Sequence, residues 1–132
     1  MSHLVDNIDI TSLLKARDAF ELFRQDMITD RDKAGAIQAF EFCYELSLQN
    51  MKRVLAQHGI EVASPREAFR QAGRNGLITN VDQWLNFLDK RNLSSHTYNQ
   101  QNVEDVLSVF NNFSEALDIF ISNLERKDDL FR

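Results

Sequence analysis

The sequence predicts an all-α protein, an antiparallel up-and-down bundle of four long helices plus a short helix. Only four glycines and one proline occur among 132 residues, so long helices are favoured over many short strands. Apolar residues recur at three- and four-residue spacing, as on the buried face of amphipathic helices. No stretch has the alternating pattern of a strand. We therefore expect residues 1–132 to form a single helical domain.

The first two expected helices are long and adjacent in the chain. Residues 1–9 are expected to be a loose lead-in, followed by a helix over about 10–27. The polar segment 29–33 offers N-capping side chains for a second helix, from about Asp32 to Gln57. At about 1.5 Å per residue, this helix would be close to 40 Å long. It is apolar on more than one side, so another bundle helix or a second subunit should cover it.

Capping residues mark the starts of the remaining helices. Ser64, followed by Pro65 in the first turn, begins a short helix that runs to about Ala72. Asn80 can cap the next helix, and Asn99 can cap a last helix with a long apolar face. Trp84 is expected in the core rather than at a stacking surface, and residues 126–132 are expected to fray.

Composition excludes several classes of protein. The net charge of −5 argues against a large non-specific nucleic-acid surface, although a small basic groove stays possible. Cys43 is the only cysteine, which excludes an intrachain disulfide and favours a reducing compartment. No run approaches the roughly 20 apolar residues of a membrane span, and no signal peptide is recognisable. We expect a cytoplasmic protein with no membrane segment, no cofactor and no metal site, since no histidine or cysteine has ligand-like spacing.

Segment 90–99 interrupts the apolar pattern and carries the candidate chemistry. Arg91 is a permanent cation whose guanidinium matches a phosphate group, and His96 has an imidazole, which can exchange a proton near neutral pH. On one ideal helix they would lie about 140° apart. Either the helix bends or ends at Ser94 and Ser95, or each residue works with its copy on another subunit. If they converge, they could hold a phosphodiester and move a proton without a metal.

A purely structural interpretation of these residues stays open. Arg91 could pair with a carboxylate such as Asp89, and His96 could pack at a helix junction. An Arg and a His at this spacing often occur together by chance. Glu41 and Glu45 of the second helix could be solvated, or they could orient the arginine or the histidine.

A second basic feature is the series Arg66, Arg70 and Arg74. The spacing of four would align these arginines as one stripe on a continuous helix. Such a stripe is usually a solvated face. The functional interpretation is a phosphate or partner contact that continues toward Lys90 and Arg91.

The order of residues around the pair resembles a known family. Arg91-Asn92-x-x-Ser95-His96-x-Tyr98 resembles the Arg-x4–6-His-x-Tyr motif of HEPN-domain proteins. More narrowly, the chain is similar to the bacterial nucleotidyltransferase substrate-binding proteins over about residues 10–125. Segments 36–46, 64–70 and 76–84 carry this narrower resemblance. The Arg–His pair is weakly specific, whereas its combination with these segments in this order is strongly specific.

The resemblance implies a function as well as a fold. It implies a HEPN-like bundle that forms a homodimer, with the two Arg–His pairs facing a shared groove. Arg91 and His96 would be the catalytic pair of a metal-independent endoribonuclease, the toxin of a toxin–antitoxin pair. Asn92 and Ser95 would support the motif. The antitoxin would be a minimal nucleotidyltransferase that transfers AMP to Tyr98, where the added anion would block an RNA phosphate.

Two alternatives to the ribonuclease remain at this level. One is a non-catalytic nucleotide- or substrate-binding subunit of a two-component nucleotidyltransferase. The other is a structural helical bundle with a decayed motif. The acidic composition is the feature that fits a general RNA-binding protein least well.

Overall fold

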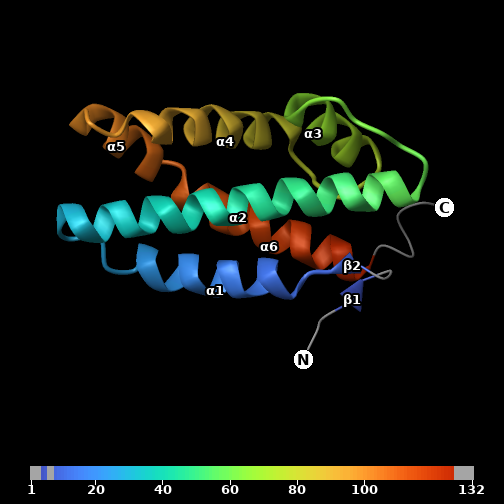
Figure 1. Ribbon diagram of the computed structural model, residues 1–132, viewed down its shortest axis with the longest axis horizontal. Helices are drawn as coiled ribbons and strands as arrows, with labels where there is room; N and C mark the ends of the chain where they lie inside the picture. Colours follow the sequence, from blue (N-terminus) through green and yellow to red (C-terminus); the bar gives the residue numbers. More distant parts are fainter. Residues whose placement is uncertain (1–3, 6–7, 127–132) are drawn as a thin grey trace.

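Helix α2 (Asp30–Gln57) runs through the middle of the molecule, and the other helices pack around it (Figure 1). The computed structural model describes residues 4–5 and 8–126. α1 lies along one side of α2, α4 lies along the other, and α6 lies behind it (Figure 1). The remaining helical elements are α1 (Thr11–Arg24), α3 (Pro65–Arg74), α4 (Val81–Leu93), the 3-10 turn η1 (Ser94–His96), α5 (Gln100–Leu107) and α6 (Phe110–Glu125). The predicted all-α antiparallel bundle is confirmed.

Side-chain caps fix where the helices begin. Thr29 Oγ1 accepts a hydrogen bond from the Asp32 backbone N–H, and the Asp32 carboxylate accepts one from the Thr29 N–H. This capping box starts α2 at Asp30, two residues earlier than expected. The predicted caps at Ser64, Asn80 and Asn99 are confirmed, since each side chain accepts a backbone N–H of its own helix.

The expected loose lead-in is partly wrong. Leu4–Val5 (β1) pairs in antiparallel register with Ile8–Asp9 (β2). Strands of two residues are too short to produce a readable alternation, which explains why the sequence pattern does not reveal them. Residues 1–3 and 6–7 of the lead-in, and residues 127–132 of the tail expected to fray, lie outside the described residues.

The expected single last helix is divided into α5 and α6. Ser108 and Val109 lie between them. The Ser108 hydroxyl donates to the Asp105 carbonyl at 2.6 Å, and the Val109 N–H bonds to Val106, three residues back. Such local bonds compete with the regular helical pattern. The break turns α5 toward the C-terminal end of α4, whereas α6 returns through the core (Figure 1).

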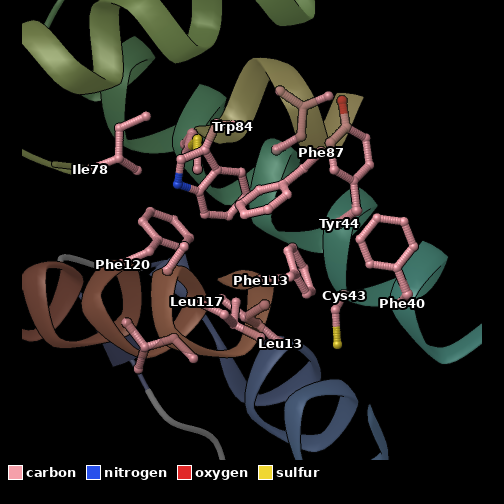
Figure 2. Close-up of a cluster of buried hydrophobic side chains, with 14 of the residues drawn as sticks. Leu13, Phe40, Cys43, Tyr44, Ile78, Trp84, Phe87, Phe113, Leu117 and Phe120 are labelled. Carbon is pink, nitrogen blue, oxygen red and sulfur yellow. The ribbon is translucent and has the colours of Figure 1, made fainter. Parts of the chain in front are cut away.

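Aromatic side chains form the centre of the core. Trp84 is 1% exposed, so the prediction of a core position is confirmed. Its ring contacts Phe87 and Phe113 edge to face, with centroids 5.3 and 5.8 Å apart (Figure 2). Tyr44 of α2 is also buried, beside Phe40 (Figure 2). This core holds α2 and α4 at a fixed distance, and the candidate site lies where their polar faces meet. In the described part of the chain, no helix has both the length and the apolar character to span a membrane.

Candidate functional site

Helix α4 ends between the two candidate catalytic residues. Arg91 lies in the last turn of α4, which ends at Leu93. Ser94–His96 then form the tighter turn η1, so His96 lies beyond the helix. The prediction that a helix bends or ends between Arg91 and His96 is confirmed, because α4 ends there.

The Arg91 side chain is 28% exposed, and two carboxylates of α2 bind its guanidinium group. Its Nε donates to Glu45 Oε1 and its Nη1 donates to Glu41 Oε2, both at 3.1 Å. Glu41 and Glu45 are one helical turn apart, so both can reach one partner. Pairing with Asp89 is wrong, because Asp89 instead lies 3.7 Å from an Arg66 nitrogen.

Ser94 connects this ion-pair cluster to η1. Its hydroxyl oxygen lies 2.6 Å from Glu41 Oε2 and 2.6 Å from the Arg91 carbonyl oxygen, so its single proton is donated to one of them. Arg91 Nη1 donates to the same hydroxyl at 3.3 Å. Because Ser94 is buried and begins the turn that carries His96, Glu41 contacts both halves of the motif.

His96 and Tyr98 lie at the surface beside each other. Their ring centroids are 6.1 Å apart, with the planes nearly perpendicular at 87°. Tyr98 is 88% exposed, so its hydroxyl is accessible to another protein. Asn102 of α5 donates to the His96 carbonyl at 2.8 Å, which ties η1 to α5. Asn92 and Ser95, the predicted supporting residues, are both exposed.

Arg91 and His96 have different partners in this arrangement. Among the described residues, no hydrogen bond or ion pair joins them, and their neighbours differ. Arg91 faces the carboxylates of α2, whereas His96 contacts Tyr98. Their convergence on one phosphodiester therefore stays a prediction.

The other predicted basic residues lie on α3 and α4. The end of α3 that carries Arg74 packs against Val81 at the start of α4, away from Arg91. Arg66 pairs with Asp89, two positions before Arg91, and so connects the start of α3 to the motif end of α4. Arg70 and Arg74 are exposed on α3, and Lys90 is half-buried on α4. Within the described residues these three cations form no ion pair.

A pocket of about 340 Å³ opens beside Tyr98, between the start of α2 and α5. Its lining mixes apolar side chains with charged and amide groups, as small-molecule sites do. The lining residues are Asp30, Lys33, Ala34, Ile37, Thr97, Tyr98, Gln100 and Val103. In the part of the chain that the structure describes, no cluster of three or more His, Cys, Asp and Glu side chains could hold a metal ion.

From the sequence alone the role of Glu41 and Glu45 stays open, and Ser94 is predicted only as a helix end and not as a site residue. The signal for the two carboxylates was their four-residue spacing, which places them on one face of a helix. Ser94 could have been suspected because it lies three residues after Arg91, close enough to bond the carbonyl at a helix end.

Comparison with known proteins places this chain in a family. Residues 10–126 match the family described as nucleotidyltransferase substrate binding protein like. Over 117 residues the chain is 34% identical to a Haemophilus influenzae protein named "Probable ribonuclease HepT". That match covers 85% of this chain and 80% of the relative.

Two solved structures share the fold. A Thermus thermophilus protein superposes with a TM-score of 0.80 at 24% identity, covering 86% of this chain and 99% of that one. A Haemophilus influenzae protein superposes with a TM-score of 0.73 at 33% identity, covering 85% and 98%. The latter is described as revealing the fold of a substrate-binding domain of a nucleotidyltransferase.

The all-α bundle of this chain is shared with the solved substrate-binding domain of a nucleotidyltransferase. Because the family match spans α1 to α6, the chain belongs to the nucleotidyltransferase substrate-binding protein family. The resemblance drawn from the sequence is thereby confirmed.

Proposed function

We propose that the protein is a metal-independent endoribonuclease, the toxin of a toxin–antitoxin pair. The observation that carries the proposal is the placement of Arg91 and His96 on either side of a helix end, with His96 at the surface. The relative named as a probable ribonuclease supports the same activity. A guanidinium and an imidazole supply the two functions that phosphodiester cleavage needs, charge stabilisation and proton transfer.

The reaction is cleavage by the substrate's own 2′-hydroxyl. The 2′-oxygen attacks phosphorus, and the bond from phosphorus to the 5′-oxygen breaks. The 2′-hydroxyl loses a proton and the leaving 5′-oxygen gains one; His96 makes one of these transfers and water makes the other. Arg91 stabilises the charge that develops on the non-bridging oxygens. The products are a 2′,3′-cyclic phosphate and a free 5′-hydroxyl.

RNA contact beyond the scissile phosphate is assigned to basic side chains of α3 and α4. Arg66, Arg70, Arg74 and Lys90 supply positive charge on an otherwise acidic chain. A homodimer doubles this set and faces the two motifs toward a shared groove. Phe42 is exposed and lines a small apolar groove between α1 and α2. This exposed apolar surface supports the proposal that a second copy of the chain packs against this face.

Control is assigned to a partner minimal nucleotidyltransferase. In this proposal the Tyr98 hydroxyl attacks the α-phosphorus of ATP, pyrophosphate leaves, and AMP stays attached to the ring. The 88% exposure of Tyr98 supports this role, since a transferase needs access to the hydroxyl. The attached phosphate and nucleoside would repel and obstruct an RNA strand at His96.

The test is RNA cleavage by the purified protein in excess EDTA. We expect cleavage by the parent chain and a loss of about 100-fold or more in Arg91→Ala and His96→Ala. Arg53→Ala and His58→Ala are matched controls, because both residues are exposed and lie at the far end of α2 from the motif. Equal cleavage by His96→Ala and the parent would refute the proposal.

A second candidate is a non-catalytic subunit that binds a nucleotide or presents Tyr98 to the transferase. The family description and the solved substrate-binding domain of a nucleotidyltransferase favour it, as does the pairing of Arg91 with two carboxylates. This candidate predicts a stable complex with a family nucleotidyltransferase and no RNA cleavage. The cleavage assay therefore separates the two functions.

A further inference from the structure

Two carboxylates hold one guanidinium, but their surroundings differ. The Glu41 side chain is 26% exposed, and its Oε2 contacts both Arg91 Nη1 and the buried Ser94 hydroxyl. The Glu45 side chain is 47% exposed. Among the described residues, Arg91 Nε is its one hydrogen-bond partner. Glu41 therefore belongs to a partly buried network, whereas Glu45 makes a single contact at the surface.

The two carboxylates accept hydrogen bonds from different nitrogen atoms of the guanidinium, and these nitrogens differ in how they could bind a phosphate. Nε and Nη2 form one edge of a guanidinium, and such an edge binds two oxygens of a phosphate at once. Within the described structure, Arg91 Nη2 makes no hydrogen bond, and Glu45 occupies Nε. Glu41 holds Nη1, outside that edge. Departure of Glu45 would open the Nε–Nη2 edge. Departure of Glu41 would still leave the Ser94 hydroxyl at Nη1, so the other two-donor edge, between Nη1 and Nη2, would stay partly occupied.

We propose that Glu41 is a positioning residue for Arg91 and that Glu45 is a counter-ion which an incoming RNA phosphate displaces. The proposal rests on the proposed ribonuclease function. With both carboxylates in place, the cluster carries one excess negative charge, which opposes a phosphate. When Glu45 is displaced, Arg91 stays paired with Glu41, which still contacts the Ser94 hydroxyl. The phosphate then binds at the open edge of the guanidinium. Binding therefore exchanges one anion for another while the guanidinium stays in place.

The kinetic test compares two neutral replacements of the same shape, one turn apart. We expect Glu45→Gln to lower KM for an RNA substrate several-fold with little change in kcat, because the competing charge is gone. We expect Glu41→Gln to lower kcat by about 10- to 100-fold, because Arg91 loses its alignment. Glu115→Gln, an exposed position on α6, is the matched control and should change neither constant.

The opposite effects of the two replacements distinguish this proposal from a merely structural cluster. A purely structural role would make both replacements change thermal stability and activity in the same direction. Higher KM in Glu45→Gln, or unchanged kcat in Glu41→Gln, overturns the proposal.

A second readout does not depend on catalysis. The NMR order parameter of the Arg91 Nε–H bond reports how firmly the guanidinium is held. We expect it to fall in Glu41→Gln and to stay near the parent value in Glu45→Gln. The reverse pattern overturns the positioning role even if no RNA is cleaved. Absence of cleavage by the parent, with the expected order parameters, counts against the ribonuclease function and leaves the positioning role supported.

Discussion

Tyr98 combines nearly complete exposure with a position two residues from His96. A residue placed in this way is open to covalent modification and close enough for the modification to affect the site. We expect the parent chain to gain AMP when incubated with a family nucleotidyltransferase and ATP, and Tyr98→Phe to gain none. Intact mass spectrometry measures the difference.

The buried tyrosine of the chain is the control for this modification. Tyr44 is 2% exposed, so Tyr44→Phe should gain AMP like the parent. Modification of Tyr98→Phe to the parent's level would show that the AMP is attached elsewhere.

Cys43 behaves as a buried apolar residue. Burial raises the pKa of its thiol from 9.0 to about 12, because the thiolate loses its hydration. Above about pH 9 the unfolded chain loses this proton before the folded chain does. The free energy of unfolding should therefore fall as the pH rises from about 9 toward 12. Urea unfolding across this range should show a steeper decrease in the parent than in Cys43→Ala, and equal slopes would contradict the assignment.

The sequence predicts Arg91 as a candidate catalytic residue, but it does not predict which carboxylates bind Arg91. The Arg91 motif lies within eight consecutive positions, and the segments that make it specific are also short and local. Glu41 and Glu45 lie 50 and 46 residues earlier in the chain. Their contact with Arg91 depends on how α2 and α4 pack, which no local pattern specifies. Only their shared helical face was readable from the sequence.

At the scale of single elements, helix starts were predicted well and the break in the last helix was not. Ser64, Asn80 and Asn99 are caps whose side-chain chemistry is readable in one sequence. The division at Ser108 contains neither glycine nor proline, so no strong breaker marks it. It is accompanied by a bond from the Ser108 hydroxyl to a backbone carbonyl, which serines also form inside unbroken helices.

Close packing between α3 and α4 gives a stability prediction. An added Cβ at Gly73 would meet Val81 Cγ2 at less than contact distance, whereas an added Cβ at Gly35 would meet nothing within 4 Å. We expect Gly73→Ala to lower the free energy of unfolding by about 1–3 kcal/mol through overpacking. Gly35→Ala should raise it by about 0.5–1 kcal/mol, because alanine favours a helix interior. Chemical denaturation measures both, and a stabilised Gly73→Ala would contradict the packing.

At the scale of the whole molecule, the exposed apolar face of α1 and α2 is where a second copy is expected. Phe42 is 57% exposed and Phe23 is 48% exposed, and both line a groove that also contains small residues. We expect the parent to have twice the 15.3 kDa chain mass by light scattering. Phe42→Arg should be a monomer with the mass of one chain, because burying an unpaired guanidinium at the dimer interface is costly.

A matched substitution on another face tests the specificity of this effect. Ile119 of α6 is 42% exposed, and Ile119→Arg should leave the dimer intact. Dissociation by Ile119→Arg but not by Phe42→Arg would place the interface on α6 instead.

RNA cleavage by the substrate's own 2′-hydroxyl, assisted by Arg91 and His96 without a metal, is the central expectation for this protein. The most direct measurement uses an RNA oligonucleotide and a copy with a single 2′-deoxy nucleotide at the cleaved position, both in excess EDTA. Mass spectrometry should find a 2′,3′-cyclic phosphate from the RNA and no cleavage at the substituted position. Cleavage of the 2′-deoxy copy at that position, or cleavage that stops in EDTA, would contradict this mechanism.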